Sequence, residues 1–244
     1  MKKLALVLLA SLVATAANAQ SFSTNGRSPS VPPGPPPVLP EAAQTITQST
    51  NPTTVAAANS VSCNGGSPSF FHTDNSYYRA FTLSTFPVLT LPQFRIDSVT
   101  IGIETANAAG TGTTQPVTVR LYKSTTNPPT VASLGAAVAT ESLNVADQTN
   151  SLLVVPITAQ PVYLVAGEIL VVEVFTPNGQ TAGHSFFLGS NALGQSGPSF
   201  LLSVPCGVSE ITNTASIGFA NMHIVMSVSG NTQTPVELIG VSIE

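Results

Sequence analysis

Apolar and polar residues alternate in short runs along most of the chain. The clearest run is PVTVRLYKS, in which Val117, Val119 and Leu121 share one face of an extended strand. Arg120 and Tyr122 fall on the opposite face. Comparable runs occupy residues 94–105, 151–159, 168–177, 184–191, 222–230 and 234–244. This pattern predicts an all-β, antiparallel fold, a β-sandwich or jelly roll, without amphipathic helices.

The first part of the chain departs from this pattern. Residues 1–19 combine two lysines, an apolar run and the sequence Ala-Asn-Ala, and they predict a secretory signal peptide. The apolar run is too short to cross a bilayer comfortably, which disfavours a membrane anchor. Residues 20–44 are rich in proline, which favours an extended linker without a core. One β-sandwich domain is therefore expected over residues 45–232, followed by a C-terminal strand or tail at 233–244.

Charge is scarce throughout the sequence. Charged residues make up 7% of the chain, against about 25% in ordinary domains. The formal net charge is −4, and removal of the two signal-peptide lysines makes it more negative. This balance argues against a basic surface for nucleic acid and a basic amphipathic helix for membranes. Solubility then depends on Ser, Thr, Asn and Gln, a composition that suits extracellular adhesive or fibre-forming proteins better than a cytosolic enzyme.

The chain contains two cysteines, Cys63 and Cys206, both beyond the predicted signal peptide. In an oxidising compartment they are expected to form one disulfide, and no C-x-x-C spacing supports a metal site. The bridge would close a loop of about 144 residues and, by restricting the unfolded chain, stabilise the fold by roughly 5 kcal/mol. It would also bring two distant loops together at one end of the sandwich, where ligand recognition is expected.

The stretch HTDNSYYRAFTL, residues 72–83, is the richest in polar chemistry. Strand periodicity places Tyr77 and Arg79 on one face, among apolar residues, and Tyr78 on the other. A buried Arg needs a partner, because an isolated charge is costly inside a protein. We therefore expect a structural ion pair between Arg79 and Glu173, with Glu104 as the next candidate. The alternative is that Arg79 holds an anionic ligand.

The same stretch supplies the best candidates for ligand binding, Asp74, Asn75, Tyr77, Tyr78 and Arg79. Tyrosine rings can stack on sugar rings while polar neighbours bind the hydroxyls. The absence of Trp and the presence of only four Tyr weaken this carbohydrate hypothesis. The alternative is that one tyrosine lies in the core and the other covers the sheet.

Asp74 and Asn75 are also candidate ligands for Ca²⁺, which prefers oxygen atoms. Asp97, Glu104 and Asp147 are further candidates for such a site, although no EF-hand spacing is present. The alternative is that Asp74 or Asn75 makes turn-forming hydrogen bonds to neighbouring backbone amides.

Sequence signals for catalysis are weak. The segment GQSGPS, residues 194–199, lacks the G-x-S-x-G spacing of a nucleophile elbow, and we interpret it as a turn. The three histidines are scattered, without the spacing typical of a zinc site. The chain is therefore expected not to be an enzyme, with a hydrolase as the least favoured alternative.

The succession CNGG, HTDNSYYRAF, GQSGPSFL, CGV and IGFANMHIVMSVSG resembles a module of predicted secreted bacterial proteins. The resemblance extends over roughly residues 45 to 230. It implies export and an accessory role, and it implies no catalytic activity. The segment TPVELIGVSIE, residues 234–244, is similar to the connector that precedes C-terminal sorting domains in some secreted bacterial proteins.

Together these features predict a secreted, non-catalytic module for extracellular binding or adhesion, on the cell surface, in the medium or in the periplasm. Its expected partner is a glycan or another surface component, and the only candidate cofactor is Ca²⁺. Neither nucleic-acid binding nor membrane insertion of the mature chain is expected. The alternative is a structural subunit of a surface or matrix polymer, which self-associates by exchanging the apolar segment 234–244.

Overall fold

The computed structural model describes residues 43–87, 93–109 and 112–233. They belong to one compact unit, Pro40–Glu244, and a separate unit, Met1–Leu39, precedes it. The predicted signal peptide, almost all of the proline-rich linker and the predicted terminal strand 234–244 lie outside the described residues. Within the described part, no helix is long and apolar enough to cross a membrane.

The first sheet is built around one long strand, β3, Gln93–Asn107. Its main path runs in the order β1-β14-β3-β6, and two short strands also pair with β3. All of these pairs are antiparallel. The remaining strands of this sheet are β1 (Gln44–Thr47), β6 (Gln148–Pro156), β7 (Val162–Leu164), β9 (Ser185–Leu188) and β14 (Met226–Gln233).

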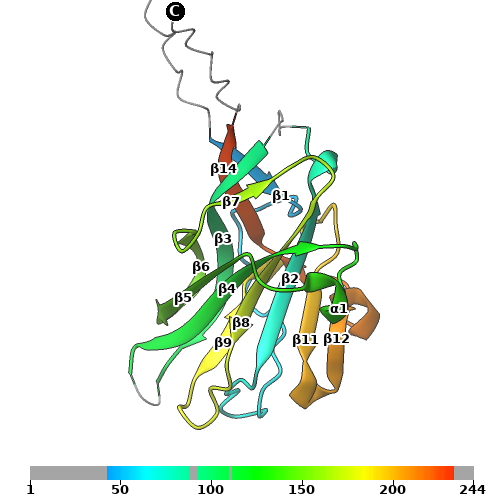
Figure 1. Ribbon diagram of the computed structural model, residues 1–244. Coiled ribbons are helices and arrows are strands. Elements are labelled where there is room, and N and C mark those ends of the chain that lie inside the picture. Colours follow the sequence, from blue (N-terminus) through cyan, green and yellow to red (C-terminus); the bar gives the residue numbers. More distant parts are fainter. Residues whose placement is uncertain (1–42, 88–92, 110–111, 234–244) are drawn as a thin grey trace, which may run out of the picture. The chain divides into compact units, whose positions relative to one another are not determined.

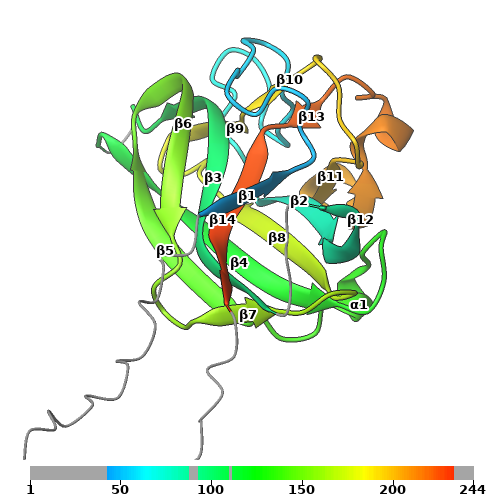
Figure 2. The same ribbon diagram turned by 90° about the horizontal axis from the view of Figure 1, so that it is seen from above.

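The second sheet is also antiparallel and has the order β12-β11-β2-β8-β4-β5 (Figures 1 and 2). Its strands are β2 (Asn75–Thr82), β4 (Thr114–Ser124), β5 (Ala139–Ala146), β8 (Ile169–Thr176), β11 (Phe200–Ser203) and β12 (Val208–Asn213). A small ladder joins β10, Ser190–Asn191, to β13, His223–Ile224. The short helices are η1 (Leu83–Thr85), α1 (Val131–Leu134), η2 (Val204–Cys206) and η3 (Thr214–Ile217).

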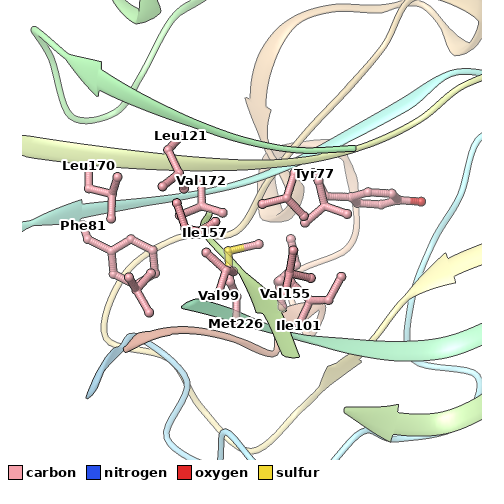
Figure 3. Close-up of a cluster of buried hydrophobic side chains, with 14 of the residues drawn as sticks. Tyr77, Phe81, Val99, Ile101, Leu121, Val155, Ile157, Leu170, Val172 and Met226 are labelled. Atoms are coloured by element: carbon pink, nitrogen blue, oxygen red, sulfur yellow. The ribbon is translucent and has the colours of Figure 1, made fainter. Parts of the chain in front are cut away.

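The hydrophobic core lies between the two sheets. Figure 3 shows side chains of the second sheet, such as Phe81 and Leu121, pointing toward Val99 and Met226 of the first. These residues are fully buried, and their sequence neighbours point away from the core because side chains alternate along a strand. The predicted all-β antiparallel fold is therefore confirmed, and it is a two-sheet sandwich.

Most of the predicted strands coincide with strands of the structure. Two runs are each divided, because the backbone leaves one ladder and enters another. The segment 184–191 contributes to β9 and β10, and the segment 222–230 contributes to β13 and β14. At the second break the Val225 backbone N–H donates to the Gly189 carbonyl at 3.0 Å, which joins the two interruptions.

Candidate functional site

The polar stretch 72–79 is mostly buried. Asn75 is 1% exposed, and its side chain is fully engaged with the backbone near the disulfide. Its Oδ1 accepts a hydrogen bond from the Cys63 N–H at 2.8 Å, and its amide donates to the Cys63 carbonyl at 3.1 Å. Asn75 therefore positions the disulfide loop, and its side chain offers almost no surface to a ligand.

The two tyrosines take opposite faces of the second sheet. Tyr77 is fully buried in the core, and its hydroxyl donates to the Val61 carbonyl at 3.0 Å. Tyr78 lies on the outer face, where it is 4% exposed and donates to Glu173 Oε1 at 3.0 Å. This is the alternative in which one tyrosine is core and the other covers the sheet. Neither ring is available as a stacking platform.

The predicted ion pair between Arg79 and Glu173 is wrong. In the β2–β8 register Arg79 faces Val172, whereas Glu173 faces Tyr78. Side chains of adjacent residues point to opposite faces, so Arg79 lies in the core and Glu173 on the outer face. Among the described residues Arg79 has no carboxylate partner, and Glu104 does not fill that role either.

Arg79 is instead satisfied by backbone carbonyls. Its Nε and Nη2 donate to the Ile224 carbonyl at 3.2 and 2.5 Å, and its Nη1 donates to the Gly197 carbonyl at 2.6 Å. Burial lowers the pKa of Arg79 to about 9, so the side chain remains a cation at neutral pH. Arg79 thus joins β13 to the turn 194–199 from inside the sandwich.

Glu173 has other partners on the outer face. It pairs with Arg120 Nη1 at 3.0 Å and accepts hydrogen bonds from the Tyr78 and Tyr122 hydroxyls at 3.0 and 2.7 Å. Burial favours the neutral acid, but hydrogen bonds from Ser76, Tyr122 and Arg120 outweigh it and lower the pKa of Glu173. Glu173 therefore remains ionised at neutral pH, and its contacts join β8 to both β2 and β4.

The predicted calcium ligands are not brought together. Asp74 is exposed, and its Oδ1 accepts a hydrogen bond from the Asn178 N–H at 2.8 Å. Glu104 binds the N–H groups of residues 59 and 60, and Asp147 binds the Ala108 N–H. Asp97 pairs with Arg95 on another face. In the described part of the chain, no group of three or more His, Cys, Asp or Glu residues is placed to hold a metal.

The predicted disulfide between Cys63 and Cys206 is confirmed, with the two Cα atoms 5.9 Å apart. It forms part of the wall of a groove of about 430 Å³, the disulfide groove. Its lining is almost entirely apolar: Val61, Ser62, Cys63, Leu201, Cys206, Gly207, Val208, Ile217 and Phe219. A concavity therefore exists where ligand recognition was expected, but none of the five predicted ligand residues lines it.

A second concavity of about 270 Å³ lies beside the turn 194–199. Gln48, Asn127 and Thr82 contribute uncharged polar groups, and Phe86 also lines the concavity. The Asn127 amide already donates to Thr82 Oγ1 at 2.9 Å, and the Gln48 amide donates to the Ala80 carbonyl at 2.7 Å. The amide groups of Asn127 and Gln48 are thus already engaged in hydrogen bonds within the protein.

A third concavity, of about 260 Å³, lies where β3 faces β7 and the segment 157–161. It is lined by Arg95, Ile96, Asp97, Ile157, Thr158, Pro161 and Tyr163. We call it the Tyr163 pocket. Three strands meet there in register, because Arg95 of β3 is paired with Asn231 of β14 on one side and with Tyr163 of β7 on the other. Direct cross-strand partners share a face, so the three side chains form one row. Asp97 lies two residues further along β3.

Hydrogen bonds order the polar side of the Tyr163 pocket. The Arg95 Nε donates to Asp97 Oδ1 at 2.8 Å, and the Asn231 amide donates to Asp97 Oδ2. The Arg95 and Asp97 side chains remain 37% and 38% exposed, and Tyr163 is 41% exposed. Hydrogen bonds therefore order a guanidinium, a carboxylate and an amide that still reach solvent, and the exposed Tyr163 ring lies in the same row.

Sequence reasoning did not predict this site. Arg95 and Asp97 alternate with the core residues Phe94 and Ile96, which indicates two outward polar side chains on one strand. In the sequence Asp97 stood out only as a candidate calcium ligand. Tyr163 and Asn231 are distant in sequence, so their arrival in the same row depends on strand pairing that periodicity does not reveal.

Comparisons with known proteins add little to this picture. No protein-family model and no curated protein matches the chain. A solved structure of the clostridial cysteine protease Cwp84 after propeptide cleavage is similar, with a TM-score of 0.49 and 11% sequence identity. The similarity covers 78% of this chain and 40% of that chain. It carries no inference about activity.

Proposed function

We propose that the chain is an exported, non-catalytic β-sandwich module that binds an uncharged saccharide in the Tyr163 pocket. The observation that carries the proposal is the cross-strand row of Asn231, Arg95 and Tyr163, with Asp97 ordered beside it. An exposed aromatic ring offers an apolar surface to the face of a sugar ring. The adjacent carboxylate, guanidinium and amide supply acceptors and donors for hydroxyl groups.

The charge of the pocket supports an uncharged ligand. Arg95 and Asp97 form an ion pair, so their opposite charges offset each other at the site. The chain as a whole has a formal net charge of −4, which disfavours an acidic polymer. Neutral sugars, by contrast, need directional hydrogen bonds and stacking, and the pocket has groups for both.

The same geometry favours binding over glycoside hydrolysis. Hydrolysis of a glycosidic bond normally requires two carboxyl groups on either side of the scissile bond. Asp97 is the one carboxylate that lines the Tyr163 pocket, and Arg95 and Asn231 hold both of its oxygens. A carboxylate in this setting is suited to accept hydroxyl hydrogen bonds rather than to act as an acid or a nucleophile.

The disulfide and the low charge support an exported location. A structural disulfide persists in an oxidising compartment, and the bond between Cys63 and Cys206 joins loops from opposite parts of the sequence. A module of this kind would attach its chain to extracellular polysaccharide. We therefore propose export and adhesion together with saccharide binding.

The experiment is a binding screen of the oxidised protein on neutral polysaccharides and oligosaccharides, with a matched pair of variants. Tyr163→Ala removes the proposed stacking ring, and Phe219→Ala removes a ring that is equally exposed, at 41%, in the disulfide groove. We expect binding that Tyr163→Ala reduces at least tenfold and Phe219→Ala leaves unchanged. The reverse dependence would place the ligand in the disulfide groove, and no binding at all would reject the saccharide proposal.

A further inference from the structure

The outer face of the first sheet continues beyond the Tyr163 pocket as two further cross-strand rows. One row consists of Thr45, Ser229, Ser98 and Pro156, which are successive register partners across β1, β14, β3 and β6. The next row consists of Thr47, Ser227, Thr100 and Val154. No charged residue belongs to either row. We call these eight positions the hydroxyl rows.

The burial of their neighbours shows that the hydroxyl rows face outward. Ile46, Val228, Val99 and Val155 alternate with them along the four strands and are at most 3% exposed. Because successive side chains point to opposite faces, the row residues lie on the outer side of the sheet. Seven of the eight are partly or fully exposed there, and Ser227 is only 8% exposed. Val154, at 57% exposure, adds an accessible aliphatic group at one end of its row.

Hydroxyl groups in these rows differ in how they are engaged. Thr45 Oγ1 and Ser229 Oγ are bonded to each other at 2.7 Å, and Thr47 Oγ1 donates to the Met226 carbonyl. The hydroxyls of Ser98 and Thr100, both half-buried on β3, make no hydrogen bond to the described residues. These two groups at the centre of the face retain their capacity to donate and accept.

The rows are continuous with the Tyr163 pocket. Arg95, Ser98 and Thr100 follow one another along the outward face of β3, with a register shift between Ser229 and Gly230 that accommodates Asp97. Rows two residues apart on a strand are separated by about 6.8 Å, so the surface from the pocket to the second hydroxyl row extends for about 14 Å. That length exceeds a single sugar ring.

We propose that this face holds a linear, uncharged polysaccharide along the direction of β3, with the Tyr163 pocket as one subsite and the hydroxyl rows as the next ones. The inference rests on the proposed saccharide binding and specifies its substrate class as an extended chain rather than a terminal sugar. The uncharged face suits a ligand whose polar groups are all hydroxyls, because no buried charge has to be desolvated. Pro156 and Val154 contact the apolar edges of the sugar rings.

The test is a chain-length series. Cello-oligosaccharides and chito-oligosaccharides of one to six sugars are titrated into the wild-type protein and into the double variant Ser98→Val/Thr100→Val. Valine keeps the β-branched shape that strands favour and replaces the hydroxyl of Thr100 with a methyl group of similar size. The matched control is Thr118→Val/Ser142→Val, a cross-strand Thr/Ser pair on the outward side of the second sheet.

We expect the wild-type affinity to rise at least tenfold from the disaccharide to the hexasaccharide. The double variant should bind the shortest sugars as the wild type does and lose this gain, while the control variant keeps it. An affinity that is independent of length, or a gain that survives in the double variant, would overturn the inference while leaving saccharide binding in place. Failure of the wild type to bind at any length would overturn both, and circular dichroism confirms that each variant is folded.

Discussion

Reduction of the disulfide between Cys63 and Cys206 should remove a large part of the stability of the fold. The bond joins residues 143 apart in sequence. Closure of a loop of that length lowers the entropy of the unfolded chain enough to stabilise the folded state by about 5 kcal/mol. Domains are typically stable by about 5–15 kcal/mol in total, so the reduced protein should be marginally folded.

Urea unfolding at neutral pH, with and without reductant, measures this loss. With a slope of about 2.5 kcal/mol/M, the midpoint of the reduced protein should fall by about 2 M. The chain has only these two cysteines, so a reductant acts on this bond alone. The control is Cys63→Ser/Cys206→Ser, whose midpoint should lie near that of the reduced protein and should not respond to the reductant.

A decrease of less than about 1 kcal/mol on reduction would show that loop closure is not what the disulfide contributes, because loop closure predicts several times more. That result would mean that noncovalent contacts already restrict the two loops. Asn75 is the side chain that would account for it, since its amide and carbonyl groups hold the Cys63 backbone without the bond to Cys206.

Three further perturbations test other parts of the structure. Glu173→Gln should cost about 3 kcal/mol at neutral pH because it leaves the partly buried Arg120 without its carboxylate. The folded-state pKa of Glu173 lies below its ordinary value of 4.5, so this contribution is present above that pH and is lost as the pH falls below it. The wild type and the variant should therefore converge in urea unfolding at acid pH, and a gap that stays constant with pH would contradict the assignment. Arg79→Lys should cost about 1.5–3 kcal/mol, because one ammonium group cannot serve the carbonyls of both Ile224 and Gly197; an unchanged unfolding midpoint would show that this bridge is dispensable. Gly230→Ala should destabilise by about 1–3 kcal/mol and weaken saccharide binding, because the Arg95 carbonyl occupies the space of the new Cβ; equal binding by wild type and variant would separate this bulge from the site.

The strands and the disulfide could be predicted from the sequence, because strand alternation is a local pattern and two cysteines can form only one bridge. Period-two alternation marks a half-buried strand whatever its partner is, and two cysteines in a chain predicted to be exported leave one pairing. Strand register is not local. A one-residue shift in the pairing of β2 with β8 decides whether Arg79 or Tyr78 lies opposite Glu173. Because neighbouring residues point to opposite faces, the observed register puts Arg79 and Glu173 on different sides of the sheet. The incorrect ion pair came from this difference.

The candidate site illustrates the same limit. Arg95, Tyr163 and Asn231 come from three strands separated by long stretches of sequence, and none of them belongs to a recognisable motif. The cluster 72–79 was prominent in the sequence because it groups charged and polar side chains in a chain that has few charged residues. In the structure Asn75, Tyr77 and Arg79 satisfy buried backbone groups, which a chain with few charges also needs. The polar cluster that stands out in the sequence therefore stabilises the interior of the fold. The exposed row of the candidate site is formed by strand pairing, which the sequence pattern does not show.

Mapping of saccharide binding by NMR tests directly whether the Tyr163 pocket and the hydroxyl rows hold the ligand. Isotope-labelled, oxidised protein is titrated with a neutral oligosaccharide that binds in the screen, and backbone amide shifts are followed. We expect the largest shifts at Arg95, Asp97, Tyr163 and Asn231, with smaller shifts that extend to Ser98 and Thr100. Shifts concentrated at the disulfide groove, around Cys206 and Phe219, would contradict this expectation.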